Sequence, residues 1–156
     1  MGILNGTSNF ILTKMTREQT SFEDALDEAQ RLGFAEADPT DDVEGVDAAR
    51  KVVITSYLSF NQVIKLNDVK LTGISGTTLS DINAADQLGF KIKLIGKGTY
   101  ENGHVHASVE PTLIHKSHQL AAVENEYNAI YVIGDAVGDT MFYGKGAGSL
   151  ATGSAV

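Results

Sequence analysis

The chain has 156 residues, 42% of them hydrophobic, which is enough for one domain with a hydrophobic core but too little for two. Its formal net charge of −8 argues against nucleic acid or an anionic membrane as a partner, because either would require clustered lysine and arginine. The chain has no cysteine and no apolar run approaching the ~18 residues of a membrane span, so we expect a soluble, cytoplasmic protein without disulfides or thiolate metal sites.

The first third of the chain is predicted to be helical. In "NGTSNFILTKM", Asn5, Thr7 and Ser8 are candidate capping side chains for a first helix. The stretch "TSFEDALDEAQRLGF" predicts a second, amphipathic helix, with Ser21 as its N-cap and Gly33 as its terminator.

Two further helices are expected. One runs from about Val43 to Phe60, because this stretch has no proline and keeps an apolar face despite Gly45. The other is a short helix in "LSDINAADQLGF", which starts near Thr78 or Ser80 and ends at Gly89.

The second half of the chain alternates in the manner of β-strands. The expected strands are "KIKLIGKGTY", "HVHASVEPTLI", "NAIYVIGDAV" and "TMFYG", with turns at "ENGH" and "GD". His104 and His106 share one face of their strand, but without a third ligand at a sensible spacing they predict exposed strand histidines rather than a metal site. We predict an α+β fold: a mixed or antiparallel sheet in the second half, covered on one face by helices mainly from the first half.

The segment "GFAEADPTDDVEGVDAARK" concentrates negative charge between residues 33 and 51. A solvated loop is one interpretation, since its proline, glycine and aspartates are turn formers and charge runs usually lie at the surface. A calcium loop is a weaker one, because the acidic positions do not follow the EF-hand spacing.

Helical geometry gives a third interpretation of this segment. Asp47, Lys51, Ile54 and Leu58 are spaced i, i+4, i+7 and i+11, so they fall on one stripe of the third helix. An i,i+4 Asp–Lys pair is most often a surface salt bridge. A lysine partly withdrawn from water beside a carboxylate is also how enzymes prepare a proton donor or acceptor, so both readings stay open.

Several blocks together resemble the substrate-binding and dimerisation domain of homoserine dehydrogenase. They are "GILNGTSNFILTKM", "GFAEADPTDDVEGVDAARKVVI", "IKLI", "NAIYVIGDAVGDTMFYGKGAG" and the final "SAV", and they occur in order over nearly the whole chain. The resemblance implies that residues 1–156 are a single domain of a longer protein, whose N-terminal nucleotide-binding domain is not part of this chain.

The resemblance also implies an activity and roles for individual residues. Members of the family interconvert L-aspartate 4-semialdehyde and L-homoserine by NAD(P)-dependent hydride transfer, in the biosynthesis of threonine, methionine and isoleucine. Matched to the family block, Lys51 is the expected proton donor to the carbonyl and Asp47 lies at the reacting end of the substrate. Glu36 is expected to bind the substrate's amino group, Asp42 to be a second carboxylate near the substrate or Lys51, and Thr7 to donate a hydrogen bond. A helix N-cap is the equally weighted alternative for Thr7.

The glycine run "YGKGAGS" is expected to approach the cofactor, with Gly146 and Gly148 allowing close backbone contact; a plain tight turn is the alternative. The run does not follow the first strand of a βαβ unit, so it is not the dinucleotide fingerprint itself. The resemblance implies that NAD(P)H is bound mainly outside this chain, that no metal is held here, and that the domain forms a homodimer. The alternative function is a dimerisation scaffold without catalysis of its own.

Overall fold

One six-stranded sheet organises the chain in the computed structural model, which describes residues 1–146 and 153–154. The strands are β1 (Gly2–Ile3), β2 (Lys70–Leu71), β3 (Phe90–Glu101), β4 (His104–His115), β5 (Tyr127–Gly134) and β6 (Gly138–Lys145). They are ordered β2-β4-β3-β1-β5-β6, and all neighbours are antiparallel except β2 and β4, which run parallel. The predicted mixed sheet and α+β class are confirmed.

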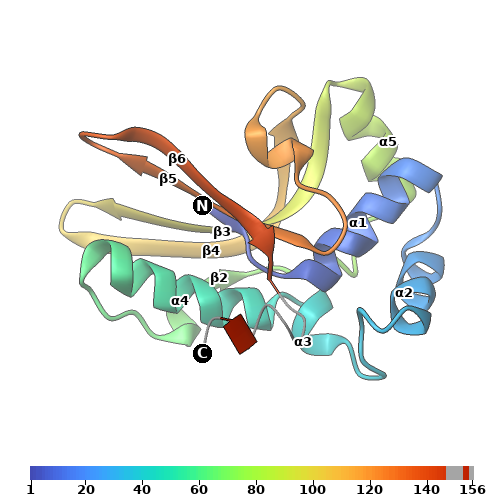
Figure 1. Cartoon of the computed structure of the whole chain (residues 1–156), viewed down its shortest axis with the longest axis horizontal. Coiled ribbons are helices and arrows are strands. Elements are labelled where there is room, and N and C mark those ends of the chain that lie inside the picture. Colours follow the sequence, from blue (N-terminus) through green and yellow to red (C-terminus); the bar gives the residue numbers. More distant parts are fainter. Residues whose placement is uncertain (147–152, 155–156) are drawn as a thin grey trace.

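The α-helices come mainly from the first half of the chain. They are α1 (Gly6–Glu18), α2 (Phe22–Arg31), α3 (Thr40–Val43), α4 (Val46–Phe60) and α5 (Leu79–Gln87). Figure 1 shows α4 along one face of the sheet, toward the left of the view. α1 and α5 lie on the right of the view. Ser21 caps α2 and Thr78 caps α5, as the sequence predicted. No helix in the described part of the chain is long and apolar enough to cross a membrane.

Two long hairpins form most of the sheet. β3 and β4 pair over their full lengths, and β5 pairs with β6 from Tyr127 opposite Lys145 to Gly134 opposite Gly138. In the β3–β4 turn Asn102 and Gly103 have φ of 52° and 83°, the conformation that the sequence "ENGH" predicts. The two-residue strand β1 joins the hairpins at the centre of the sheet.

The prediction of one helix from about Val43 to Phe60 is wrong about where the helix begins. α3 ends at Val43, and α4 begins only at Val46. Gly45, between them, has φ of 80°, a left-handed conformation that interrupts the helical ladder. The break turns the acidic segment, so that carboxylates from both helices point toward the start of α1.

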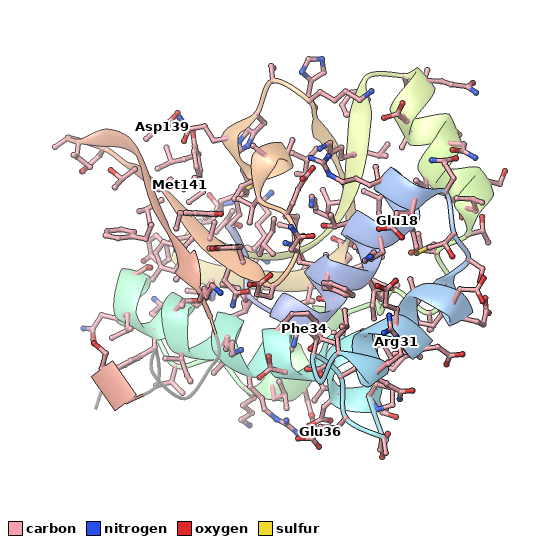
Figure 2. The ribbon with its side chains drawn as sticks, turned by 45° about the vertical axis from the view of Figure 1, so that its right-hand side comes forward. Glu18, Arg31, Phe34, Glu36, Asp139 and Met141 are labelled. Atoms are coloured by element: carbon pink, nitrogen blue, oxygen red, sulfur yellow. The ribbon has the colours of Figure 1, made fainter. Side chains whose placement is uncertain are left out.

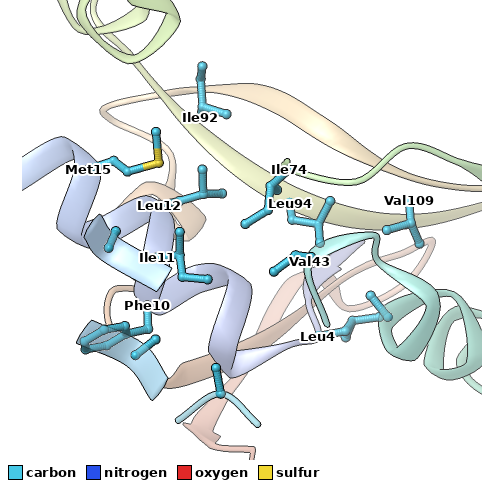
Figure 3. Close-up of a cluster of buried hydrophobic side chains, with 14 of the residues drawn as sticks. Leu4, Phe10, Ile11, Leu12, Met15, Val43, Ile74, Ile92, Leu94 and Val109 are labelled. Atoms are coloured by element: carbon cyan, nitrogen blue, oxygen red, sulfur yellow. The ribbon is translucent and has the colours of Figure 1, made fainter. Parts of the chain in front are cut away.

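The main core lies between the helices and the sheet (Figure 3). Buried side chains of α1 pack with Ile92 and Leu94 of β3 and Val109 of β4. α4 approaches β3 closely at two glycines of the strand. A Cβ added to Gly96 would lie 2.5 Å from the Val52 side chain, and one added to Gly98 would lie 2.5 Å from the Ser56 side chain. The absence of side chains at Gly96 and Gly98 therefore allows the short distance between α4 and the sheet.

A smaller cluster packs on the opposite face of the sheet. Ile3, Ile95 and Tyr131 belong to one buried cluster with Leu120 of a short 3₁₀ turn, Gln119–Ala122, which covers one end of that face. Toward the hairpin tips, side chains on this face are exposed. His104 and His106 are among them, so their predicted exposure is confirmed. No group of three or more metal-ligating side chains occurs in the part of the chain that the structure describes.

Candidate active site

The junction between β1 and α1 is the centre of the candidate site. Asn5 is the N-cap of α1: its backbone is extended and its Oδ1 accepts a hydrogen bond from the backbone N–H of Ser8 at 2.8 Å. The side chain is buried, with 5% of its surface exposed. Of the three predicted capping residues, Asn5 therefore performs this role.

The amide nitrogen of Asn5 joins two aspartates from different helices. Its Nδ2 donates to Asp42 Oδ1 at 2.6 Å and to Asp47 Oδ2 at 2.9 Å. Asp42 lies on α3 and Asp47 in the first turn of α4, so the break at Gly45 brings them to one donor. An amide NH₂ has two hydrogens, and this arrangement uses both.

Lys51 completes the cluster one helical turn after Asp47. Its Nζ donates to Asp47 Oδ2 at 2.7 Å and to the backbone oxygen of Leu4 at 3.0 Å. An ammonium has three N–H bonds, so these contacts leave one for a ligand. The side chain is 42% exposed, which keeps the third N–H accessible.

A cavity of about 320 Å³ opens beside this ammonium. Leu4, Lys51 and Thr55 line one side, and residues of β5, β6 and the following Gly146 line the other. An ammonium held by a carboxylate at the edge of a mainly apolar cavity can donate a proton to a bound oxygen atom.

The acidic segment divides into two parts. Asp41 pairs with Arg50 at the surface, and Asp38 accepts hydrogen bonds from the backbone and hydroxyl of Thr40. The bonds from Thr40 lower the pKa of Asp38. The surface-loop interpretation therefore describes these two residues, whereas Asp42 and Asp47 face inward to Asn5.

Thr7 and Glu36 lie apart from the cluster in this structure. The Thr7 hydroxyl donates to the backbone oxygen of Phe34 at 2.7 Å, and Thr7 follows the N-cap of α1 rather than being it. This bond ties α1 to the α2–α3 loop. Glu36 is on the same loop with an exposed side chain, at the lower edge of Figure 2. Among the described residues, no hydrogen bond joins either side chain to Asp42, Asp47 or Lys51.

Gly146 makes a close approach, but to a residue of this chain. An added Cβ there would lie 2.0 Å from Nδ2 of Asn128, a residue of β5 that also lines the cavity. The Oδ1 of Asn128 is buried and has no hydrogen-bond partner among the described residues. Gly148 lies outside the described residues.

The comparison with protein families is decisive for identity. The model of the homoserine dehydrogenase family matches residues 1–156, the whole chain. The chain belongs to the homoserine dehydrogenase family. The resemblance that the sequence blocks suggested is thereby confirmed.

Similar homoserine dehydrogenases cover 98–100% of this chain but are much longer. The Bacillus subtilis homoserine dehydrogenase is 55% identical over 156 residues, which are 100% of this chain and 36% of that protein. The crystal structure of the Staphylococcus aureus homoserine dehydrogenase at pH 6.5 is 89% identical with a TM-score of 0.96, and covers 99% of this chain and 39% of that one. A hyperthermophilic archaeal homoserine dehydrogenase mutant, solved in complex with NADPH, is 27% identical with a TM-score of 0.79, covering 98% and 43%. This chain thus spans well under half the length of these homoserine dehydrogenases.

Two groups that form the site, the Asn5 amide and the Leu4 backbone oxygen, could not be assigned to it from the sequence. Asn5 was recognisable as a capping residue, but its bonds to Asp42 and Asp47 span 37 and 42 residues of sequence. The Leu4 backbone oxygen carries no sequence signature at all. Only the i,i+4 contact between Asp47 and Lys51 follows directly from helical periodicity.

Proposed function

We propose that this chain is the substrate-binding domain of a homoserine dehydrogenase, a single domain of a longer enzyme. That enzyme interconverts L-aspartate 4-semialdehyde and L-homoserine with NAD(P)H, in the biosynthesis of threonine, methionine and isoleucine. The observation that carries the proposal is the Lys51 ammonium, held by Asp47 and the Leu4 carbonyl at the edge of a cavity.

Lys51 is the proton donor in this proposal. Reduction of an aldehyde leaves negative charge on the former carbonyl oxygen, which a positioned ammonium stabilises and then protonates. The two observed bonds orient Nζ, so that its third N–H is available to the substrate oxygen. In the reverse direction the neutral amine accepts the hydroxyl proton, and Asp47 stabilises the ammonium that forms.

The carboxylates provide the complement to the substrate's α-ammonium. Asp42 reaches the cluster through Asn5, and Glu36 has an exposed carboxylate on the neighbouring loop. Charge-assisted bonds from an ammonium to such carboxylates are stronger than neutral ones. Glu36 contacts the substrate only if the α2–α3 loop turns its side chain toward Asp42. The Thr7 hydroxyl holds that loop through its bond to the Phe34 backbone oxygen. In this proposal the hydroxyl or the backbone amide of Thr7 also forms a hydrogen bond with the substrate.

The cavity also fits the nicotinamide end of the cofactor. Its lining is mainly apolar, Gly144 and Gly146 bring bare backbone to its wall, and the buried Oδ1 of Asn128 lacks a donor among the described residues. When bound, NAD(P)H supplies the hydride. Gly146 is the residue of this chain that we place next to it, together with Gly148, while the part of the enzyme outside this chain binds most of the cofactor.

The test is a substitution of Lys51 in the full-length enzyme. Lys51→Ala is expected to lower kcat by ~100-fold or more, with a smaller change in the KM for L-homoserine. Lys70→Ala is the matched control, because Lys70 also pairs with a carboxylate, Glu110, but far from the cavity. A Lys51→Ala enzyme with the kcat of the Lys70→Ala enzyme would refute the role of Lys51.

A second candidate function is self-association through the sheet. The face opposite the helices leaves side chains toward the hairpin tips exposed, including Lys97, Thr99 in part and Ile133 (73% exposed). A symmetric dimer that stacks two such faces would cover them. Light scattering of the chain at high concentration tests this: a dimer mass that Ile133→Lys abolishes supports it, and a strict monomer contradicts it.

A further inference from the structure

We propose that Asn5 is a positioning residue of the reaction: its amide fixes the Asp47 carboxylate that orients Lys51, and couples Asp42 to the same site. The inference rests on the proposed function of Lys51. It assigns a role to a residue that does not line the cavity beside Lys51 but bonds directly to both aspartates of the site.

The argument begins with the donors around Asp47. Its Oδ2 accepts from Lys51 Nζ at 2.7 Å and from Asn5 Nδ2 at 2.9 Å. Without Asn5, the bond from Lys51 alone would hold this oxygen, and the exposed i,i+4 pair would be free to change rotamers. The second donor is buried and comes from a different element, so it fixes where the carboxylate can lie.

The neighbouring residue fixes the ammonium itself. The Leu4 backbone oxygen accepts from Lys51 Nζ at 3.0 Å, and Leu4 is 6% exposed. Two consecutive residues at the β1–α1 junction therefore hold both members of the Asp47–Lys51 pair. Since Asn5 Oδ1 is also bonded to the Ser8 N–H, the junction is anchored to α1 and cannot rotate independently.

Charge explains why an amide is suited to this position. Asp42 on α3, Asp47 and Lys51 on α4 are the charged side chains bonded to Asn5 or to its partners, and nearby Asp41 and Arg50 pair with each other. The two carboxylates thus share one neutral double donor, and only Asp47 is also bonded to the ammonium. A carboxylate in place of the amide would remove both hydrogen bonds and add a third negative charge, which raises carboxyl pKa values.

The test uses Asn5→Asp in the full-length enzyme. This variant keeps a side-chain oxygen for the Ser8 N–H, so the cap of α1 is retained while both donated bonds are lost. The acid limb of the kcat/KM profile for L-homoserine is expected to move up by about one pH unit, with kcat reduced ~10-fold or more. Asn5→Ser, which is neutral and keeps a cap, is expected to lower kcat in the same direction, and serves if Asn5→Asp does not fold.

Two controls separate positioning from a structural role. Ser21→Ala removes the N-cap of α2 and is expected to lower the melting temperature without moving the acid limb. Asn5→Asp with Asp42→Asn restores a donor between positions 5 and 42. We expect the double variant to recover part of the kcat lost in Asn5→Asp, because one like-charge contact is removed.

The outcomes are distinguishable from failure of the proposed function. If Lys51→Ala is inactive but Asn5→Asp and Asn5→Ser keep the wild-type kcat and acid limb, the positioning role is wrong and the proton donor stands. If the double variant is no better than Asn5→Asp, the coupling to Asp42 is wrong. If Lys51→Ala retains its kcat, the proposed function fails, whatever the Asn5 variants do.

Discussion

Two asparagines of the same "NGTSN" block each lie beside a lysine. One lysine faces the candidate site and the other belongs to a buried hydrogen-bond network, so the comparison contrasts a site residue with a structural one. Asn5, at the cap of α1, lies beside the half-exposed Lys51 and two carboxylates. Asn9, one turn later and 1% exposed, lies beside Lys93, which is 2% exposed. The surroundings of the two lysines differ in charge as well as in burial.

Lys93 is held entirely by neutral oxygens. Its Nζ donates to Asn9 Oδ1 at 2.9 Å and to the Val123 backbone oxygen at 2.6 Å. Burial, with a smaller contribution from Lys91, lowers the pKa of Lys93 to about 7. Nδ2 of Asn9 donates to the carbonyls of Val123, Asn125 and Tyr127, so the network fastens α1 to the segment before β5.

The comparison separates an unusual lysine environment from access to a ligand. Both lysines donate two N–H bonds to protein atoms, but Lys93, which has the shifted pKa, is shielded from solvent, so its third N–H is not open to a ligand. Lys51 has a carboxylate partner, an open cavity and an accessible third N–H. Access and a charge partner, rather than burial, mark the residue that can act on a ligand.

The largest effect is expected from breaking the buried network. Asn9→Ala would leave the Lys93 ammonium with one oxygen and deprive the Asn125 and Tyr127 carbonyls of a donor. Removing one partner of a buried charge costs about 3–5 kcal/mol, and we expect a loss of unfolding free energy of about 3 kcal/mol. Urea unfolding of the chain measures it, with Asn83→Ala on α5 as the helix control. A loss below about 1 kcal/mol would mean that the network contributes little.

The next largest effect is expected from displacing α4, the helix that carries Asp47 and Lys51, from the sheet. An alanine Cβ at Gly98 would lie 2.5 Å from the Ser56 hydroxyl, on the buried face of α4. Overpacking of this kind costs about 1–3 kcal/mol. We expect Gly98→Ala to destabilise the chain in urea and, in the full-length enzyme, to lower kcat because α4 carries Asp47 and Lys51. Gly76→Ala is the matched control, because Gly76 has open space around it, has no positive φ and does not line the cavity beside Lys51. Equal stabilities of the two variants would show that α4 tolerates the displacement.

Sequence reasoning predicted the parts of this arrangement that depend on local pattern. Helical periodicity placed Asp47 beside Lys51, and the turn signal at "ENGH" placed the β3–β4 hairpin. The two-residue strand β1 has no pattern to detect, although it positions both Leu4 and Asn5. Lys93 lies in "KIKLI", where alternation predicts an outward side chain, and its burial depends on a 3₁₀ turn about 30 residues away. Contacts made by folding across the sheet were therefore not predictable.

A different kind of effect is expected in the pH dependence of stability. Because the pKa of Lys93 is about 7 in the folded chain and near 10.5 when unfolded, the unfolded state binds more protons between these values. Stability therefore rises with pH across that window, by up to about 1.4 kcal/mol per pH unit, and below pH 7 the full cost of the buried charge persists. Arg17, Lys91 and Glu124 are the charged groups that act on it.

Lys93→Met is expected to remove this slope between pH 8 and 10, when unfolding free energies from urea titrations are compared with those of the wild-type chain. Lys97→Met, on the same face of β3 but exposed, should leave the slope unchanged. A wild-type slope that survives in Lys93→Met would place the titrating group elsewhere.

The smallest expected effect completes the comparison between the two lysines. Lys51→Ala removes an ion pair whose side chains are 42% and 30% exposed, and exposed pairs contribute about 0–1 kcal/mol. The Asp47 carboxylate retains its bond from Asn5, so it is not left unsatisfied. We therefore expect the unfolding free energy of the chain to fall by less than about 1 kcal/mol, even though the same change should abolish most turnover in the full-length enzyme. A loss as large as that of Asn9→Ala would make Lys51 a structural residue like Lys93, and the distinction between the two asparagines would no longer hold.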